Sequence, residues 1–231
     1  QSLLDLVATQ NFRLLTNGSE RMRIDDIGRV GIGMSPSAYL SIRPTGSGSA
    51  DSHIGYGTNR DTYITTGDAG VVVFREESGT ERMRIDATGA VTMPHQPAFL
   101  AKPASAQLNI GTNSEVTVAF GLEIFDQNAD FASNTFTAPV TGKYQFNLSL
   151  YTNNVDTAAD YYVVAIKTSN RTYQNVTDPL FTSDPVYWSQ VLCVLADMDA
   201  NDTAHVFLQQ GAGNAQTDIT TECLFSGYLV A

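Results

Sequence analysis

The chain has 231 residues, and 13 Lys and Arg stand against 24 Asp and Glu, which gives a formal net charge of −11. This excess of negative charge repels phosphate backbones and anionic lipid surfaces, so we do not expect a nucleic-acid partner. No run of about 18 apolar residues occurs, so membrane insertion is not expected either.

The first part of the chain contains a repeat. Residues 18–25, Gly-Ser-Glu-Arg-Met-Arg-Ile-Asp, recur as residues 79–86, Gly-Thr-Glu-Arg-Met-Arg-Ile-Asp. In each copy the apolar residues alternate with charged ones, which is the period-two pattern of a half-buried strand. Gly28 and Gly89 follow the copies where a turn is needed. The repeat therefore predicts two related β-hairpins.

Short strand-like segments without a helical period lie between the two copies. Hairpins of this length expose their edges and bury too little apolar surface to be stable alone. We therefore expect residues 1–93 to form a β-structured, trimeric shaft whose core is completed by neighbouring chains. The charged residues of the repeat, such as Glu20 and Arg23, could form ladders between chains or lie in solvent.

A domain boundary is predicted between residues 93 and 94, because Pro94 and Pro97 interrupt the strand pattern. Residues 1–93 hold nine Arg and eleven acids (net −2), and residues 94–231 hold four basic residues and thirteen acids (net −9). Strand-like stretches then cover residues 98–102, 115–118, 135–138, 142–151, 161–168, 187–195, 204–209 and 220–230. Antiparallel strands in this number favour a β-sandwich or jelly roll.

Three blocks of the second part carry a resemblance to a known family. They are residues 97–101 (Pro-Ala-Phe-Leu-Ala), residues 136–146 (Phe-Thr-Ala-Pro-Val-Thr-Gly-Lys-Tyr-Gln-Phe) and residues 224–229 (Leu-Phe-Ser-Gly-Tyr-Leu). In this order they resemble the globular head of the complement first-component q subunit, within the tumour necrosis factor superfamily. The resemblance implies a jelly-roll head over residues 94–231 and a threefold homotrimer. We assign to the structural core the aromatic residues Phe136, Tyr144, Phe146, Phe225 and Tyr228.

Residues 21–33 carry a second resemblance. They read Arg-Met-Arg-Ile-Asp, two variable residues, Gly and, after Arg29, Val-Gly-Ile-Gly. This string resembles the repeats of tailed-phage fibre and tail-spike proteins, although similar strings occur in bacterial surface proteins. Such fibres often end in a self-cleaving chaperone domain, whereas this chain ends in the sandwich. The two resemblances together imply the tip of a bacteriophage tail fibre, located in the virion and made in the host bacterial cytoplasm.

Receptor contacts are expected in loops, because loops tolerate change while a rigid sandwich holds them in place. Residues 153–160 and 171–188 combine Asn, Asp and Thr with aromatic residues, which suit hydrogen bonds and stacking against sugars. The candidate contact residues are Asn153, Asp156, Asp160, Tyr173, Tyr187 and Trp188. Tyr187 and Trp188 have an alternative interpretation, which is packing inside the sandwich or at the trimer seam.

No catalytic residue, metal site or cofactor is assigned. Asp197, Asp199 and Asn201 begin like a calcium loop, but the later glycine and glutamate of such a loop are missing, so a surface turn is favoured. Cys193 and Cys223 lie in apolar, strand-like surroundings. We expect both to be small buried residues with free thiols and no disulfide.

Three functions are compatible with these patterns. The favoured one is non-enzymatic attachment of a homotrimer to a polysaccharide or an outer-membrane protein on the host surface. A capsule-degrading depolymerase would need a pair of carboxylates, whose separation sequence does not reveal. A purely structural trimerisation cap is the third possibility.

Overall fold

The computed structural model describes residues 11–33, 35–36, 40–42, 52–56, 62–65, 70–76 and 78–231. Within these residues the regular elements are all strands, so the all-β prediction is confirmed. The chain divides into two compact units, residues 1–93 and residues 94–231. No helix in the described ranges is long and apolar enough to cross a membrane.

The first unit contains two small sheets. One follows the chain order β1 (Phe12–Thr16), β2 (Ser19–Ile24), β3 (Val30–Ile32), β4 (Leu40–Ile42), β5 (Ser52–Tyr56) and β6 (Thr62–Thr65). The other consists of β7 (Val72–Arg75), β8 (Glu81–Ile85) and β9 (Val91–Thr92). Neighbouring strands pair antiparallel except β3 and β4, which are parallel. The two copies of the repeat form β2–β3 and β8–β9, as the pattern predicts.

In both copies of the repeat, the aspartate at the equivalent position closes the turn. The Asp25 carboxylate accepts the backbone N–H of Arg29 at 2.8 Å, and that of Asp86 accepts the N–H of Ala90 at 3.0 Å. Glycines in the left-handed region follow, with φ of 87° at Gly28 and 90° at Gly89. A side chain would strain this backbone, so each turn depends on its glycine.

Charged side chains of the repeat pair within the chain. The Arg23 Nε atom donates to Glu20 at 2.6 Å, and Arg84 contacts Glu81 in the same way. In the β7–β8–β9 sheet, Val72 is the cross-strand partner of Ile85, and Ile85 is the partner of Val91. These apolar side chains therefore lie on the same side of the sheet. Val91 is exposed there. The pairs observed are therefore intrachain, and an apolar side of this sheet is open.

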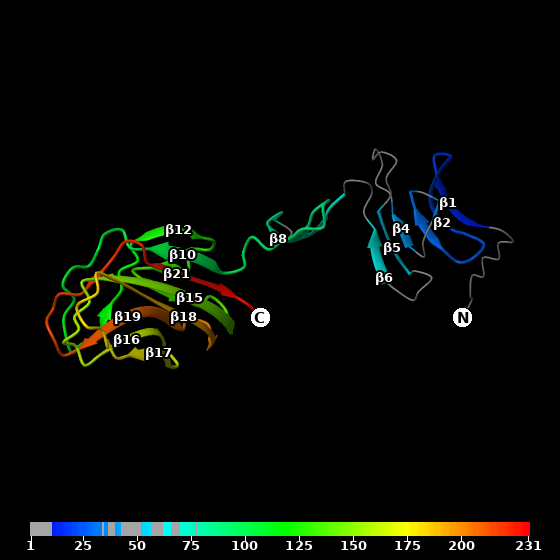
Figure 1. Ribbon diagram of the computed structural model, residues 1–231. Coiled ribbons are helices and arrows are strands. Elements are labelled where there is room, and N and C mark those ends of the chain that lie inside the picture. The colour runs from blue at the N-terminus through cyan, green and yellow to red at the C-terminus, as the bar shows by residue number, and fades with distance from the viewer. Residues whose placement is uncertain are drawn as a thin grey trace. The chain divides into compact units, whose positions relative to one another are not determined.

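The second unit is a sandwich of two antiparallel sheets, drawn as two layers in Figure 1. The first sheet has the order β12 (Leu122–Asp126), β10 (Ala98–Lys102), β21 (Leu224–Leu229), β15 (Gly142–Asn153) and β18 (Tyr187–Met198), with β20 (Asp218–Ile219) paired to β15. The second has the order β13 (Phe131–Ala132), β14 (Thr135–Thr137), β19 (Thr203–Gly211), β16 (Tyr161–Thr168) and β17 (Thr172–Thr177), with β11 (Val116–Thr117) paired to β19.

The core lies between the two sheets and is rich in aromatic rings. Of the residues assigned to it, Phe136, Tyr144, Phe146 and Phe225 are fully buried. Phe136 and Phe146 meet edge to face with centroids 5.5 Å apart, and Phe146 stacks on Phe225 at 5.8 Å. Edge and offset contacts of this kind stabilise a core beyond the area that they bury.

Tyr228 does not belong to the core, contrary to the prediction. Its side chain is 47 % exposed. The inward position of β21 is taken by Gly227, where an added Cβ would lie 2.5 Å from the Phe146 ring and 2.7 Å from the Phe99 ring. Since successive residues of a strand face opposite sides, Tyr228 points outward.

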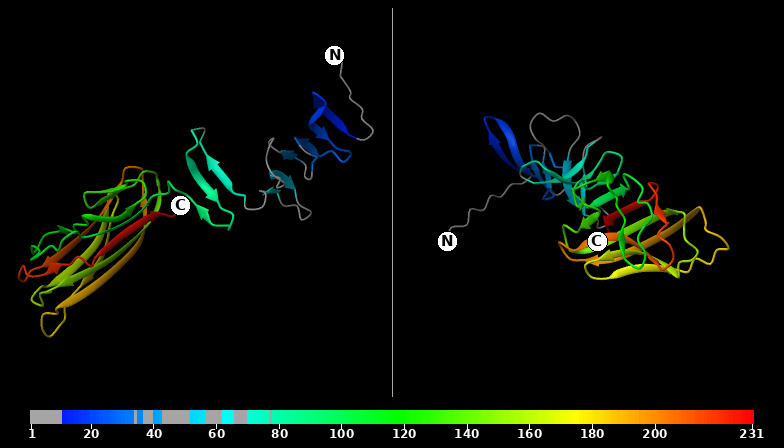
Figure 2. Two further views of the ribbon diagram at one scale, coloured as in Figure 1. Left: turned by 90° about the horizontal axis from the view of Figure 1, so that it is seen from above. Right: turned by 90° about the vertical axis from the view of Figure 1, so that its left-hand side faces the viewer.

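The sandwich has two ends, which Figure 2 shows from two further sides. Residues 94–97 join it beside the C-terminus, where the Leu229 N–H donates to Pro97 and the Lys143 N–H donates to Ala231. We call this the linker end. We call the opposite end, formed by residues 103–114, 154–160, 178–186 and 212–223, the loop end. Asn153 pairs with Tyr187 there, so β15 and β18 run the full distance between the ends.

Candidate functional site

The loop end is organised around the buried hydroxyl of Tyr162, at the start of β16. It accepts the Asp156 N–H at 3.0 Å and lies 2.7 Å from Thr217 Oγ1 and 3.1 Å from Gln210 Oε1. The Gln210 amide group then donates to two carbonyls of residues 212–223. Burial raises the pKa of Tyr162, although the bond to Thr217 opposes this, so the phenol stays neutral. Two loops are thereby fixed to the sandwich.

Asp156 belongs to this framework and is not a contact residue, which corrects the prediction. It is 2 % exposed, and its carboxylate accepts the backbone N–H groups of Ala158, at 2.8 Å, and Asn214. Gly213, with φ of 72°, leaves the space that the carboxylate occupies. A buried carboxylate with backbone donors on both oxygens holds loops together and is closed to a ligand.

Asp184 connects the 178–186 loop to its neighbours. One carboxylate oxygen accepts the Thr157 hydroxyl at 2.6 Å and the Thr157 N–H at 2.9 Å, and the other accepts the Gln216 amide at 2.9 Å. The Thr157 hydroxyl is the main reason why the pKa of Asp184 is lowered, with further help from the Thr157 N–H and Gln216. All of these donors are uncharged.

Asp218 connects the fourth segment of the loop end, residues 103–114, to the other three. Its carboxylate accepts the Asn109 N–H at 2.7 Å and the Asn154 side-chain amide at 2.8 Å. Of the two other predicted contacts in residues 153–160, Asp160 is exposed and Asn153 is half-buried. The four segments of the loop end thus form one hydrogen-bonded platform.

Aromatic side chains lie at the border of this platform. The exposed Tyr187 ring stacks on Tyr151 with centroids 5.8 Å apart. Trp188 points the other way, is partly buried, and meets Tyr162 and Phe181 edge to face at 5.3 and 5.8 Å. The alternative interpretation of Trp188, packing in the sandwich, therefore holds, while the Tyr187 side chain is exposed on the outward side of β18.

Tyr173 lies at the other end of the sandwich, so the predicted aromatic cluster is divided. Residues 172–177 form strand β17 and are not part of a loop. The Tyr173 hydroxyl donates to Asp197 at 3.4 Å. Asp197 lies nine residues beyond Trp188 on β18, about 30 Å along an extended strand.

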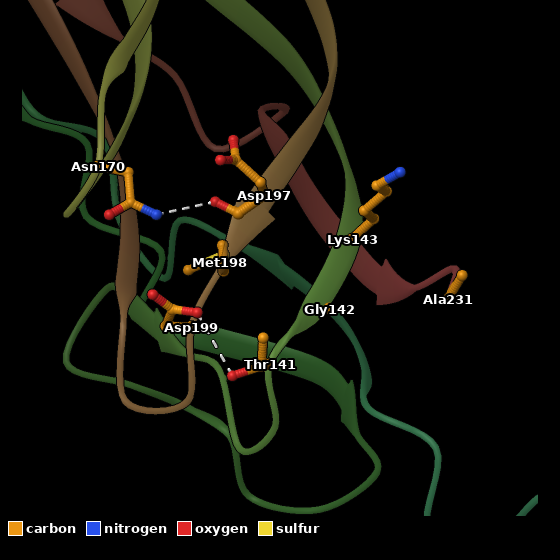
Figure 3. Close-up of a pocket in the computed structure, with 8 residues that line it drawn as sticks. All are labelled: Thr141, Gly142, Lys143, Asn170, Asp197, Met198, Asp199 and Ala231. Carbon is orange, nitrogen blue, oxygen red and sulfur yellow. Dashed lines mark hydrogen bonds between the residues drawn. The ribbon is translucent and has the colours of Figure 1, made fainter.

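The linker end holds an open cavity of about 390 Å³ lined by Thr141, Gly142, Lys143, Asn170, Asp197, Met198, Asp199 and Ala231 (Figure 3). The Asn170 amide donates to the Asp197 carbonyl at 3.0 Å. Beside the cavity, Arg171 donates to the Asp197 carboxylate at 2.5 Å and lowers its pKa.

The segment that begins like a calcium loop forms a tight turn. The Asp202 N–H donates to the Asp199 carbonyl at 3.0 Å, and Asn201 has a φ of 75°. No group of acidic, histidine or cysteine side chains in the described part of the chain is arranged to hold a metal.

A second surface is the outward side of the β12–β10–β21–β15–β18 sheet, which we call the open face. The outward side chains of β15, the strand between β21 and β18, are mostly polar. On both sides of β15, apolar or aromatic side chains are exposed: Phe125, Leu224, Tyr228, Val191 and Leu195. A single sheet face with this many exposed apolar side chains is typical of an association surface.

Cys193 also lies exposed on the open face, whereas Cys223 is buried, so the prediction of two buried cysteines is wrong for Cys193. The sulfur of Cys223 points to the opposite side of the sheet, where it contacts the Tyr151 backbone. Both thiols are free. The outward position of Cys193 follows from its place between Val191 and Leu195 in the alternation of β18.

A protein-family model described as C1q domain matches residues 98–230, which is more than half of the chain and spans β10 to β21. The chain belongs to the C1q domain family. The jelly-roll prediction is thereby confirmed. C1q and related domains are typically trimeric binding or trimerising modules without enzymatic activity.

Solved structures of low identity resemble the C1q domain of this chain. The globular domain of the zebrafish complement 1qA protein is 17% identical, with a TM-score of 0.46, over 59% of this chain and 98% of that chain. A crystal structure of murine APRIL, at pH 8.5, is 10% identical, with a TM-score of 0.42, over 58% and 99%. No curated protein matches the chain.

Proposed function

We propose that this chain is the receptor-binding end of a bacteriophage tail fibre, a virion protein made in the host cytoplasm. Three copies assemble through the C1q domain and attach the particle to a polysaccharide or an outer-membrane protein on the host surface. The observation that carries this proposal is the open face. The repeat at residues 18–25 and 79–86, which resembles those of phage fibres, supports the assignment to a fibre.

The open face supports assembly for a physical reason. Side chains such as Val191 and Leu195 expose apolar surface to water on one side of a rigid sheet, and its burial against a second copy is favourable. C1q domains commonly form homotrimers. A threefold assembly repeats each loop end three times, so weak individual sites gain avidity.

The loop end supports binding because its segments are already fixed. Tyr162, Asp184 and Asp218 tie the loops together before any ligand arrives. A platform of this kind loses little conformational entropy on binding.

The two alternative functions receive less support. A depolymerase needs two carboxylates beside the scissile bond, but the one fully buried acid among the described residues is Asp156, whose oxygens accept backbone N–H groups. A structural cap would not need a rigid platform at the loop end. Incubation with host capsule, followed by an assay for new reducing ends, identifies a depolymerase.

Assembly is tested by Val191→Asp, which places a charge on β18 among the exposed apolar side chains of the open face. We expect the parent chain to sediment as three copies of 24.9 kDa and the variant to sediment as a folded monomer, because burial of an unpaired charge is unfavourable. Val140→Asp, at an exposed position of the linker end, is the matched control and should stay trimeric. A monomeric parent chain at micromolar concentration would contradict the proposal.

Attachment is tested with fluorescently labelled full chain on a panel of bacterial strains. We expect saturable binding to a subset of strains, strong for the trimer and weak for Val191→Asp, because the variant loses avidity. Absence of binding to every strain that the parent phage infects would leave the structural cap as the better explanation.

A further inference from the structure

The loop end exposes aliphatic side chains as well as polar ones. Leu180 is 86 % exposed, Leu108 is 66 % exposed and Val186 is 60 % exposed. Hydrogen bonds connect the segments that carry Leu108 and Val186, since Asn109 contacts Asp218, and Asn154 contacts both Asp218 and the Val186 carbonyl. Leu180 lies on the same 178–186 loop as Val186. The three aliphatic side chains offer no hydrogen bonds to sugar hydroxyls, and burial against an apolar partner is what stabilises them.

The same platform carries negative charge without compensation. Its four segments, residues 103–114, 154–160, 178–186 and 212–223, contain six acids (Asp156, Asp160, Asp178, Asp184, Asp218 and Glu222) and no Lys or Arg. Asp184 and Asp218 accept hydrogen bonds from hydroxyl, amide and backbone donors, which leave the full charge in place. The surface around the aliphatic residues is therefore anionic.

These two properties select among the receptors that the proposed function allows. Acidic capsules, phosphate-bearing lipopolysaccharide and anionic lipids would be repelled by the carboxylates. A neutral polysaccharide would leave Leu180 and Val186 without a suitable contact. An apolar protein patch with Lys and Arg at its rim matches both, because hydrophobic contact supplies affinity and opposite charges set orientation and association rate.

We propose that the loop end binds a protein receptor through an apolar patch of that receptor surrounded by Lys and Arg. This inference rests on the proposed attachment function and narrows the receptor to a protein of stated chemistry. Leu180 and Val186 supply the central contact, and Asp160 and Asp178, both exposed, meet the basic rim.

The test is a selection of displayed random dodecapeptides on the immobilised full-length trimer. We expect the enriched peptides to combine Lys or Arg with aliphatic or aromatic residues. Their affinity should fall about tenfold or more in Leu180→Ser/Val186→Ser, because central apolar contacts dominate binding. It should fall less in Asp160→Asn/Asp178→Asn, and the binding of the parent should weaken as salt rises from about 50 to about 500 mM.

The controls separate the loop end from the rest of the chain. Val140→Ser removes an exposed apolar side chain at the linker end, and Asp26→Asn removes an exposed charge of the first unit; neither should change peptide binding. Sedimentation confirms that each variant is still a trimer. Peptides that carry no net positive charge, or that bind the Leu180→Ser/Val186→Ser variant as well as the parent, would overturn the inference.

A glycan array and anionic phosphatidylglycerol vesicles complete the experiment. We expect neither to bind through the loop end. Binding of a glycan or a vesicle that is lost in Leu180→Ser/Val186→Ser would overturn the protein receptor while leaving attachment intact. If the trimer binds no bacterial strain at all, the proposed function itself fails, and the two failures are thereby distinguished.

Discussion

The loop end and the linker end of the C1q domain share the same strands but are held by different chemistry. At the loop end, buried and uncharged donors meet around Tyr162, and Asp184 accepts a hydroxyl, an N–H and an amide. At the linker end, an exposed guanidinium pairs with Asp197. Salt screens the ion pair of Arg171 and Asp197 more than it screens hydrogen bonds from uncharged donors. The difference teaches that a common scaffold can combine an end held by uncharged donors with an end that carries an exposed ion pair.

The largest expected effect comes from the aromatic residues at the boundary of the loop end. Trp188→Ala removes contacts with Tyr162 and Phe181, and we expect a loss of about 3 kcal/mol of unfolding free energy, at the lower end for a buried aromatic. Tyr187→Ala, one residue earlier, should cost about 1 kcal/mol or less, because its ring is exposed. Urea unfolding of both variants measures this. Equal losses would show that Tyr187 is structural too.

An intermediate effect is expected from Tyr162→Phe, which deletes the central hydroxyl of the platform. Loss of its contacts with Thr217, Gln210 and the Asp156 N–H should cost about 1–3 kcal/mol. Hydrogen exchange should accelerate at the amides of residues 156 and 214 and stay unchanged at residues 197–202. Uniform acceleration at both ends would mean that the network does not act locally.

The smallest effect concerns two carboxylates, one from each end. The pKa of Asp197 is lowered by Arg171 and that of Asp184 by the Thr157 hydroxyl. Both ionised carboxylates therefore stabilise the fold fully at pH values above 3.8, which is the usual pKa of an aspartate. This stability is lost as the pH falls through their folded pKa values.

Salt should separate the two carboxylates in an NMR titration. We expect the pKa of Asp197 to rise toward its ordinary value in high salt, because the partner is charged, while that of Asp184 stays low. Arg171→Gln should raise only the pKa of Asp197, and Thr157→Val only that of Asp184. A common salt response would remove this distinction between the ends.

The sandwich could be predicted because its strands alternate so regularly. Tyr144 and Phe146 show the period of two on one strand, and the blocks around them identify the family. Strand β17 was less visible, since its residues Thr172–Thr177 are mostly polar and lie at the edge of a sheet. The outward turn of Tyr228 follows from the same alternation, because Tyr228 lies three residues beyond the buried Phe225 on β21 and Gly227 takes the inward position.

The candidate site was harder to predict than the fold. Asp156 has the composition of a contact residue, yet its carboxylate is satisfied by an N–H group 58 residues away. Tyr173 and Trp188 are close in sequence, but β17 runs from the linker end to the loop end between them. The two residues therefore lie at opposite ends. The exposure of Leu180 follows only from the position of its loop, so hydrogen bonds between distant segments decide which side chains a ligand can reach.

The two cysteines give the chain a consequence in labelling chemistry. Cys193 lies exposed on the open face, whereas burial raises the pKa of the Cys223 thiol, which donates to the Tyr151 carbonyl at 3.3 Å. Alkylating reagents attack the accessible thiolate. A maleimide dye added to the folded Val191→Asp monomer is therefore directed to Cys193 on the edge strand β18, whereas assembly through the open face covers this thiol in the parent trimer.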